Sequence, residues 1–214
     1  MMDLDIPEKL VPIRDKIDSF VRSKVDPLTE EYFDNIDVGD RWSWNDRQKE
    51  IMEGLKAEAK EAGLWNFFLP ESQGGAGVSN LEYAHLAEVM ARNPIASEVF
   101  NCAAPDTGNM EVLERYGTEE QKKEWLEPLL EGKIRSAFAM TEPDVASSDA
   151  TNIATSAVLD GDEWLINGSK HYISGCRLYT PDAADDPPRE DPGCRSITKK
   201  KKPTITPVLL TTPH

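Results

Sequence analysis

Three segments in the first 133 residues carry the residue pattern that starts an α-helix. In each, an Asn, Ser or Thr is followed three residues later by Glu or Gln, as in a capping box; the segments begin at Asn45, Ser79 and Thr118. Apolar residues then recur at steps of three and four, which places them on one face of each helix. Residues 10–25 show the same spacing. The pattern predicts an all-α domain over residues 1–133.

The pattern changes after Lys133 from helical spacing to short segments separated by turn residues. The short segments are residues 136–142, 153–159, 164–166 and 170–175, and the turn dipeptides are Asp160-Gly161 and Asn167-Gly168. A meander of three or four strands leaves an unpaired edge and half a core, so the expected sheet is antiparallel and incomplete. The sequence therefore predicts an α+β chain with a partial β-domain over residues 134–175.

The composition changes again near residue 175. Seven of the 15 prolines lie in residues 176–214, which contain one aromatic residue, Tyr179, and carry a net charge of +2. Such a segment buries too little apolar surface to offset the entropy lost on ordering. We predict a disordered Pro/Lys-rich tail after the two folded parts.

The chain as a whole is acidic, with 39 Asp and Glu against 24 Lys and Arg and a net charge of −15. This charge repels phosphate at long range, so generic nucleic-acid binding is not expected. No run approaches the roughly 18 apolar residues of a membrane span. The N-terminal residues lack a signal peptide or presequence, and the three cysteines lack CxxC spacing, so neither secretion nor a disulfide or metal site is expected. We expect an intracellular protein, with mitochondrion, peroxisome and cytoplasm all open.

The region best able to carry chemistry is the loop of residues 138–149. A predicted strand that ends at Thr141 leads into small and hydroxyl residues, among them Ser147 and Ser148. Backbone N–H groups and hydroxyls of such a loop can bind a phosphate or a flavin edge without basic side chains. A polar turn between two strands explains the same residues, because hydroxyl-rich turns are common.

Four segments, in this order, resemble the acyl-CoA dehydrogenase family. They are LPESQGGAG at residues 69–77, YGTEEQK at 116–122, AMTEP at 139–143 followed by Ser148-Asp149, and INGSK at 166–170 followed by YISG at 172–175. The resemblance covers roughly residues 5–175 and is nearest to family members ten and eleven. It implies a helical N-terminal domain, a middle β-domain and a C-terminal four-helix domain, with FAD between the last two. It also implies a homo-oligomer that completes the site.

Carried over residue by residue, the resemblance assigns a first set of cofactor contacts to the loop. Phe138, Met140 and Thr141 would lie along the flavin, with the Thr141 hydroxyl and backbone at its pyrimidine end. Ser147 and Ser148 would contact the pyrophosphate or the acyl-CoA. Ser147 stands where the family usually has Gly, and the loop holds one extra residue, so the phosphate-binding part could be displaced.

The second set of contacts lies further along the chain. Tyr172, Ile173 and Ser174 match the segment that packs on the dimethylbenzene side of the flavin, with Tyr172 in the place of a usual Trp. The Ser174 hydroxyl would reach flavin N5. A donor at N5 stabilises the charge that develops as hydride arrives, and an apolar wall excludes water.

The resemblance implies α,β-dehydrogenation of an acyl-CoA thioester. A base removes the α-proton while the β-hydride passes to FAD, and an electron-transferring flavoprotein reoxidises the flavin. In the family the base is a carboxylate of the C-terminal domain, and no Glu in residues 1–175 matches it. Glu71 and Glu142 lie in family motifs but are interpreted as structural, because loop carboxylates usually accept bonds from backbone N–H groups or face water. No catalytic residue and no metal ligand is assigned.

After Gly175 the tail replaces the expected continuation of the middle domain, which predicts a chain truncated before the C-terminal domain and impaired in catalysis. Three other functions stay open at this point. One is an unrelated helical interaction module, which is disfavoured because it leaves residues 141–149 and 172–174 unexplained. An acyl-CoA oxidase-like flavoprotein would pass electrons to oxygen and form peroxide. A non-catalytic partner would form mixed oligomers with a full-length relative and elute together with it.

Overall fold

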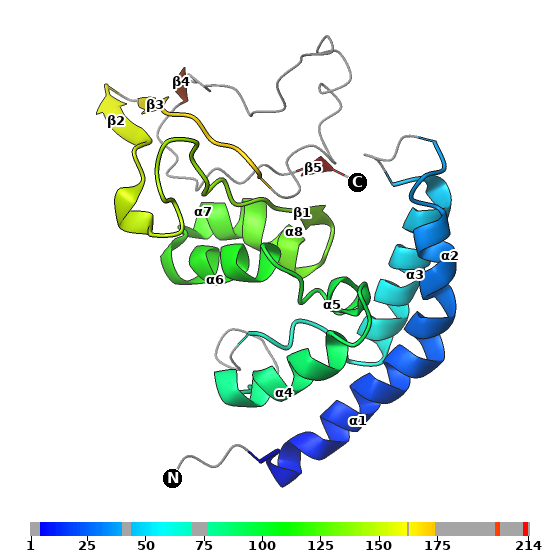
Figure 1. Cartoon of the computed structure of the whole chain (residues 1–214). Helices are drawn as coiled ribbons and strands as arrows, with labels where there is room; N and C mark the ends of the chain where they lie inside the picture. The colour runs from blue at the N-terminus through cyan, green and yellow to red at the C-terminus, as the bar shows by residue number, and fades with distance from the viewer. Residues whose placement is uncertain are drawn as a thin grey trace. The chain divides into compact units, whose positions relative to one another are not determined.

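A computed structural model of the protein describes residues 5–39, 44–69, 77–161, 163–173, 200–201 and 212–213. The chain divides into two compact units, Met1–Gly132 and Lys133–His214 (Figure 1). Within the described ranges, no helix has the length and apolar character required to span a membrane.

The first unit is built from helices. They are α1 (Val11–Phe20), α2 (Asp26–Asp34), α3 (Asp46–Glu61), α4 (Asn80–Met90), α5 (Ala96–Val99), α6 (Asp106–Tyr116), α7 (Glu119–Gln121) and α8 (Glu127–Leu130). A 3-10 turn, Glu8–Leu10, precedes α1, and the π-helical turns Val21–Val25 and Lys122–Leu126 continue α1 into α2 and α7 into α8. Helix α3 packs beside α2, and α4 packs on α1 (Figure 1). The predicted helical character of this part of the chain is confirmed.

The core of this unit collects the apolar stripes of its helices. Ile17, Val21 and Val25, which share one face of the first helical segment, are all buried. Phe100 is fully buried, and its ring lies 5.5 Å from the Phe20 ring in edge-on geometry. Helical spacing places these side chains together because residues three and four apart lie on the same face.

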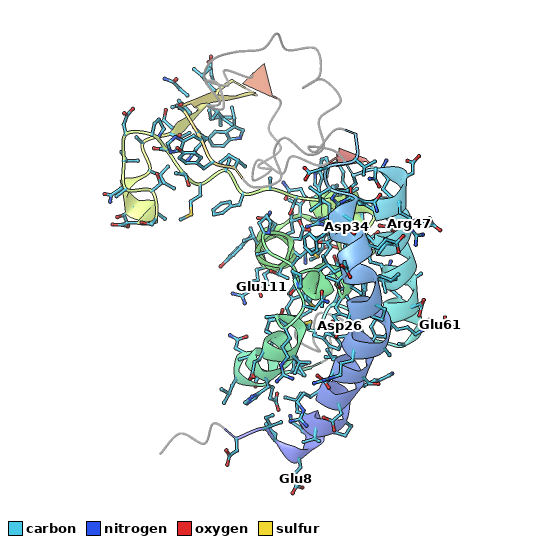
Figure 2. The ribbon with its side chains drawn as sticks, turned by 45° about the vertical axis from the view of Figure 1, so that its right-hand side comes forward. Glu8, Asp26, Asp34, Arg47, Glu61 and Glu111 are labelled. Carbon is cyan, nitrogen blue, oxygen red and sulfur yellow. The ribbon has the colours of Figure 1, made fainter. Side chains whose placement is uncertain are left out.

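Acidic side chains lie on the outside of the same unit. Glu8, Asp26 and Glu61 come from three different helical segments, and all three are exposed (Figure 2). The charged residues thus remain in water while the apolar stripes are buried.

All three predicted capping boxes form. The pairs are Asn45–Gln48 at α3, Ser79–Glu82 at α4 and Thr118–Gln121 at α7. At α4, Ser79 N donates to Glu82 Oε2 at 2.7 Å, and Glu82 N donates to Ser79 Oγ at 3.3 Å. Lys9 Nζ lies 2.6 Å from Glu82 Oε1, and this ammonium, together with the Ser79 donors, lowers the pKa of Glu82 to about 2.

Side chains from distant loops donate hydrogen bonds to the carbonyls at the C-terminal end of α8, the last helix of the unit. Asn101 Nδ2 donates to Leu129 O at 3.0 Å, and Leu130 O accepts from Trp65 Nε1 at 2.8 Å and from Asn66 Nδ2 at 3.0 Å. The last turn of an α-helix leaves its C=O groups without α-helical partners. The side chains of Trp65 and Asn66 bind Leu130 O, whereas Leu129 O also accepts from Gly132 N at 2.9 Å. Asn66 and Asn101 have φ angles of 53° and 54°, a region that Asn adopts more readily than most residues.

We expect Asn101→Ala to lower the free energy of unfolding of the first unit by about 1–3 kcal/mol, because Leu129 O and Asn66 Oδ1 each lose a hydrogen bond donated by the buried Asn101 side chain. Alanine is also poorly suited to the positive φ. Urea unfolding followed by circular dichroism measures the change. Asn80→Ala, at an exposed position on α4, is the matched control, and a shift no larger for Asn101→Ala than for Asn80→Ala would contradict the capping role.

The second unit contains short antiparallel strands. They are β1 (Ile134–Arg135), β2 (Ser156–Asp160), β3 (Glu163–Asn167), β4 (Lys200–Lys201) and β5 (Thr212–Pro213). Strand β3 lies between β2 and β4, and β1 pairs with β5. Asp160 is opposite Glu163 across the end of the hairpin, and Gly161 has a φ of 63° in the turn. The predicted hairpin at Asp160-Gly161 is therefore confirmed, as is the α+β class.

Three details of the predicted sheet are wrong. Residues 136–142 form no strand, and neither do residues 170–173, the described part of the predicted segment 170–175. Asn167-Gly168 forms no hairpin turn, because Gly168 does not adopt the positive φ of such turns. Gly168 instead lies against Thr155, where an added Cβ would be 2.1 Å from Thr155 Oγ1. The predicted disordered tail falls outside the described residues, apart from β4 and β5.

Candidate functional site

The candidate site is formed by two segments of the second unit, residues 138–149 and 170–173. His171 N donates to Thr141 O at 3.0 Å, which fixes the two segments side by side. They are the segments to which the sequence analysis assigned contacts with one cofactor. Their proximity is an observation, whereas the cofactor contacts themselves stay a prediction.

An ion pair lies where the segments meet. Glu142 Oε1 is 2.8 Å from Lys170 Nζ and accepts from Thr155 N at 2.9 Å, while its Oε2 accepts from Ala154 N at 2.7 Å. Lys170 Nζ also donates to Met140 O at 2.9 Å. The side chains of Glu142 and Lys170 are only 5% and 20% exposed. One carboxylate therefore links the loop, the approach to β2 and the second segment.

These contacts set the pKa of the Glu142 carboxyl group. The Lys170 ammonium, followed by the Thr155 side chain and backbone N–H groups, lowers the pKa of the carboxyl to about 2. A carboxylate with both oxygens occupied and so low a pKa is a poor proton acceptor. The interpretation of Glu142 as structural is confirmed, while Glu71 lies outside the described residues.

The pKa of Glu142 predicts how the site responds to acid. Because the folded-state pKa of about 2 lies below the ordinary value of 4.5, Glu142 stabilises the fold fully above about pH 4.5 and loses this effect as the pH falls toward 2. We expect the NMR signals of the Ala154 and Thr155 amides to shift with a midpoint near pH 2. Glu142→Gln should abolish the shift, and a wild-type midpoint at pH 4.5 or above would contradict the contacts described.

Ser147 stabilises the loop of residues 138–149 through hydrogen bonds within the loop. Its side chain is buried, its Oγ accepts from Glu142 N at 2.7 Å, and it donates to Val145 O at 3.1 Å. The only hydroxyl proton is therefore used within the loop. Ser148 is exposed, and its amide and hydroxyl make no hydrogen bond to any other residue in the described ranges. The predicted contacts of both serines with a pyrophosphate or an acyl-CoA stay predictions.

The start of the loop presents apolar groups and unpaired donors. Phe138 is 56% exposed, and Met140 and Thr141 are half-buried. Thr141 N–H and Oγ have no hydrogen-bond partner among the residues that the structure describes. An apolar surface beside a few free donors is the combination that holds a flavin ring by its face and by its polar edge. The residues present therefore fit FAD.

The second segment carries an unusual backbone. Tyr172 has a φ of 53°, its side chain is 85% exposed, and its ring centroid lies 4.3 Å from that of His171. A positive φ costs an aromatic residue about 1–2 kcal/mol and often marks a functional position. Ile173 is half-buried, and Ser174 lies outside the described residues.

Comparison with known proteins identifies the family of this chain. Residues 7–133 match the family model of the acyl-CoA dehydrogenase N-terminal domain. The chain belongs to the acyl-CoA dehydrogenase family. It is 47% identical to mouse acyl-CoA dehydrogenase family member 10 over 94% of its own length, and 52% identical to chicken family member 11 over 75%. It spans 20% of the length of each of these relatives. The resemblance to members ten and eleven is thus confirmed.

Solved acyl-CoA dehydrogenase structures share the fold. A putative acyl-CoA dehydrogenase from Mycobacterium abscessus is 46% identical with a TM-score of 0.71, and the match covers 82% of this chain and 45% of that one. An acyl-CoA dehydrogenase from Bacillus anthracis complexed with FAD is 29% identical with a TM-score of 0.55, over 83% of this chain and 28% of that one.

One residue that is central in the candidate site, Lys170, had no predicted role. Lys170 ends the INGSK segment, which carried the family resemblance. Its contacts with Met140 and Glu142 span 30 and 28 positions of the sequence, so no local pattern could reveal them.

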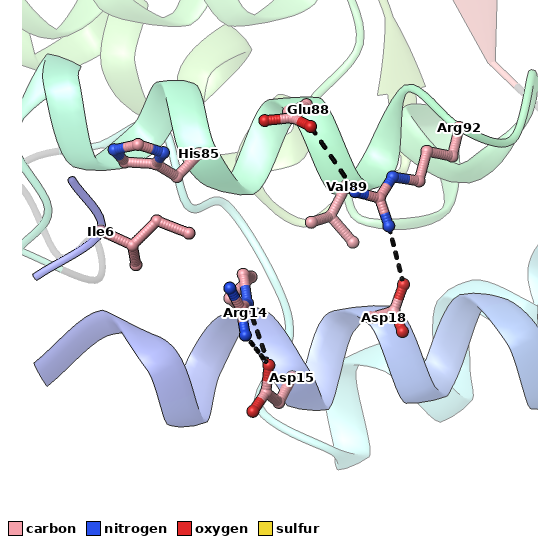
Figure 3. A pocket seen from close by; sticks show the side chains of 8 residues that line it. All are labelled: Ile6, Arg14, Asp15, Asp18, His85, Glu88, Val89 and Arg92. Carbon is pink, nitrogen blue, oxygen red and sulfur yellow. Dashed lines mark hydrogen bonds and ion pairs between the residues drawn. The ribbon is translucent and has the colours of Figure 1, made fainter. Parts of the chain in front are cut away.

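A pocket of about 210 Å³ lies in the helical unit, between α1 and α4 (Figure 3). It is lined by Ile6, Arg14, Asp15, Asp18, His85, Glu88, Val89 and Arg92. Arg14 pairs with Asp15, and Arg92 lies between Asp18 and Glu88 at 3.4 and 3.5 Å. Each carboxylate of the lining is paired with an arginine, and the described part of the chain holds no group of three or more His, Cys, Asp or Glu residues suited to a metal.

Proposed function

We propose that this chain provides the helical N-terminal domain and the flavin-contacting part of the middle domain for FAD-dependent α,β-dehydrogenation of acyl-CoA thioesters. The observation that supports it most is the hydrogen bond from His171 N to Thr141 O, which joins the two segments assigned to the flavin. Family membership and the FAD complex of the Bacillus anthracis relative point the same way.

Different residues of this chain would bind different parts of FAD. Thr141 N–H and Oγ would donate to the pyrimidine edge, and Phe138 and Met140 would cover a face of the ring and exclude water. Ser148, with its free amide and hydroxyl, would bind the pyrophosphate or the acyl-CoA. Ile173 and Ser174 would complete the contacts from the second segment. When bound, FAD supplies the acceptor for the β-hydride.

Neither Glu142 nor Asp149 of the candidate site is a suitable base for the α-proton. Glu142 is held by Lys170 and two backbone amides, and Asp149 Oδ1 accepts from Thr151 N at 3.0 Å and Thr151 Oγ1 at 2.7 Å. We propose that the base, and the contact with an electron-transferring flavoprotein, are not provided by these residues. A mixed oligomer with a full-length relative would supply them.

A flavin titration tests the binding role. We expect FAD fluorescence to be quenched saturably by the purified chain, and Thr141→Val to weaken binding about fivefold to tenfold through the loss of one hydrogen bond. Thr107→Val, on α6 of the helical unit, is the matched control and should bind like wild type. Equal affinity of the Thr141 and Thr107 variants would contradict the role of the Thr141 hydroxyl.

A turnover assay tests the absence of a base. The chain with FAD, a series of acyl-CoA thioesters and an artificial electron acceptor should show no rate above that of free FAD. Measurable turnover would show that these residues do provide a base, and peroxide formed in its course would indicate an oxidase.

A further inference from the structure

The Glu142–Lys170 ion pair has a second consequence for the candidate site. Lys170 Nζ binds Met140 O, and the backbone N–H of the next residue, His171, binds Thr141 O. Two consecutive residues of one segment thus hold two consecutive carbonyls of the other. The distances are 2.9 and 3.0 Å, within the normal range of hydrogen bonds.

The Lys170 contact fixes the direction of a free donor. In a planar trans peptide, the C=O of one residue and the N–H of the next point in opposite directions. Because Met140 O points toward Lys170 Nζ, Thr141 N–H points away from it. That N–H has no partner among the described residues, so the contact presents it on the side left open for a ligand.

Glu142 in turn holds the ammonium in place. Its carboxylate is fixed by Ala154 N and Thr155 N, and Lys170 Nζ lies 2.8 Å from its Oε1. Without Glu142 the lysine would be a flexible side chain with a half-buried charge, and its bond to Met140 O would compete with water. Glu142 and Lys170 therefore act together to hold the Met140 carbonyl.

We propose that Glu142 and Lys170 are positioning residues for the flavin, a clamp that sets the orientation of the Met140–Thr141 peptide and so the direction of the Thr141 N–H donor. This inference rests on the proposed function, because it takes Thr141 as a flavin contact. Neither clamp residue touches the cofactor.

The test compares Lys170→Met with Lys170→Arg and with a matched control, Lys122→Met. Lys122 is 25% exposed and pairs with Glu114 at 3.5 Å, so its replacement also breaks a half-buried ion pair, but one that lies within the helical unit. We expect Lys170→Met to weaken FAD binding at least about tenfold, as expected for the loss of a charge-assisted hydrogen bond. Lys170→Arg should restore most of the affinity, and Lys122→Met should bind like wild type.

A second readout needs no flavin. Amide exchange at His171 and the NMR shift of the Thr141 amide, measured on the chain alone, should change in Lys170→Met and not in Lys122→Met. If the wild-type chain binds no FAD, the proposed function fails while this readout still tests the clamp. Unchanged Thr141 and His171 signals in Lys170→Met would overturn it.

Lys170→Met leaves a buried carboxylate without its partner, which could unfold the loop. The double variant Glu142→Gln with Lys170→Met removes both charges and avoids this effect. It should lose FAD affinity to the same extent as Lys170→Met. Wild-type affinity in the double variant, or a Lys170→Arg chain as weak as Lys170→Met, would overturn the inference.

Discussion

Replacing Phe100 by Ala is expected to lower the free energy of unfolding of the helical unit by about 3–5 kcal/mol. Phe100 is fully buried, and its ring centroid lies 5.5 Å from that of Phe20 and 6.2 Å from that of Phe67. These partners belong to α1 and to the loop after α3, so the collapse needed to fill the cavity would have to move both at once. Urea unfolding followed by circular dichroism measures the change.

Phe33→Ala is the matched control for this substitution. Phe33 is 42% exposed on α2 and pairs edge-on with Tyr32 at 5.6 Å, so its removal leaves no enclosed cavity. We expect a loss of about 1 kcal/mol or less. Equal losses in the two variants would contradict the assignment of Phe100 to the centre of the core.

Gly168→Ala is expected to have the largest effect in the second unit. The added Cβ would lie 2.1 Å from Thr155 Oγ1 and 2.7 Å from Thr155 Cβ, so Thr155 must move. Its backbone N–H then loses its bond to Glu142 Oε1, and the clamp loses one of its anchors. Overpacking of this kind costs about 1–3 kcal/mol.

The measurement is the NMR signal of the Thr155 amide, together with the FAD titration, and both should change in Gly168→Ala. Gly54→Ala, on the exposed face of α3, has nothing within 4 Å of the added Cβ and should raise stability by up to about 1 kcal/mol. A Gly168→Ala chain with the wild-type Thr155 signal would show that this contact is absent in solution.

The parts of the fold that the sequence predicted depend on residues close together in the chain. The capping boxes at Asn45, Ser79 and Thr118 form within three residues, and the Asp160-Gly161 turn forms between adjacent strands. Helix α6 lacks such a signal, because Pro105 precedes it without a side-chain cap. Its start could not be predicted from a capping box.

The errors in the sheet arise from contacts between distant residues. The dipeptide Asn167-Gly168 is typical of a turn. In the structure, however, glycine is required at position 168 because Thr155 lies against it across the hairpin. Likewise, residues 136–142 have the composition of a strand but do not form one in the structure. Local propensity favours a conformation, whereas pairing decides whether it forms.

The candidate site was predicted by resemblance to a family, and its geometry was not. The motifs around Thr141 and Tyr172 identified two segments of the site. In the structure, the hydrogen bond from His171 N to Thr141 O joins them. Neither spacing nor composition indicated that Lys170 would bind Met140 O, or that the Ser147 hydroxyl would be used inside its own loop. Such roles depend on which carbonyl lies within reach after folding.

The central claim is that residues 138–149 and 170–173 form a flavin-binding surface. The most direct test is the visible absorption spectrum of the purified chain after FAD has been added and the excess removed by gel filtration. The account predicts a flavin band that elutes with the protein and is weaker for Lys170→Met than for Lys122→Met. A colourless wild-type chain would contradict it.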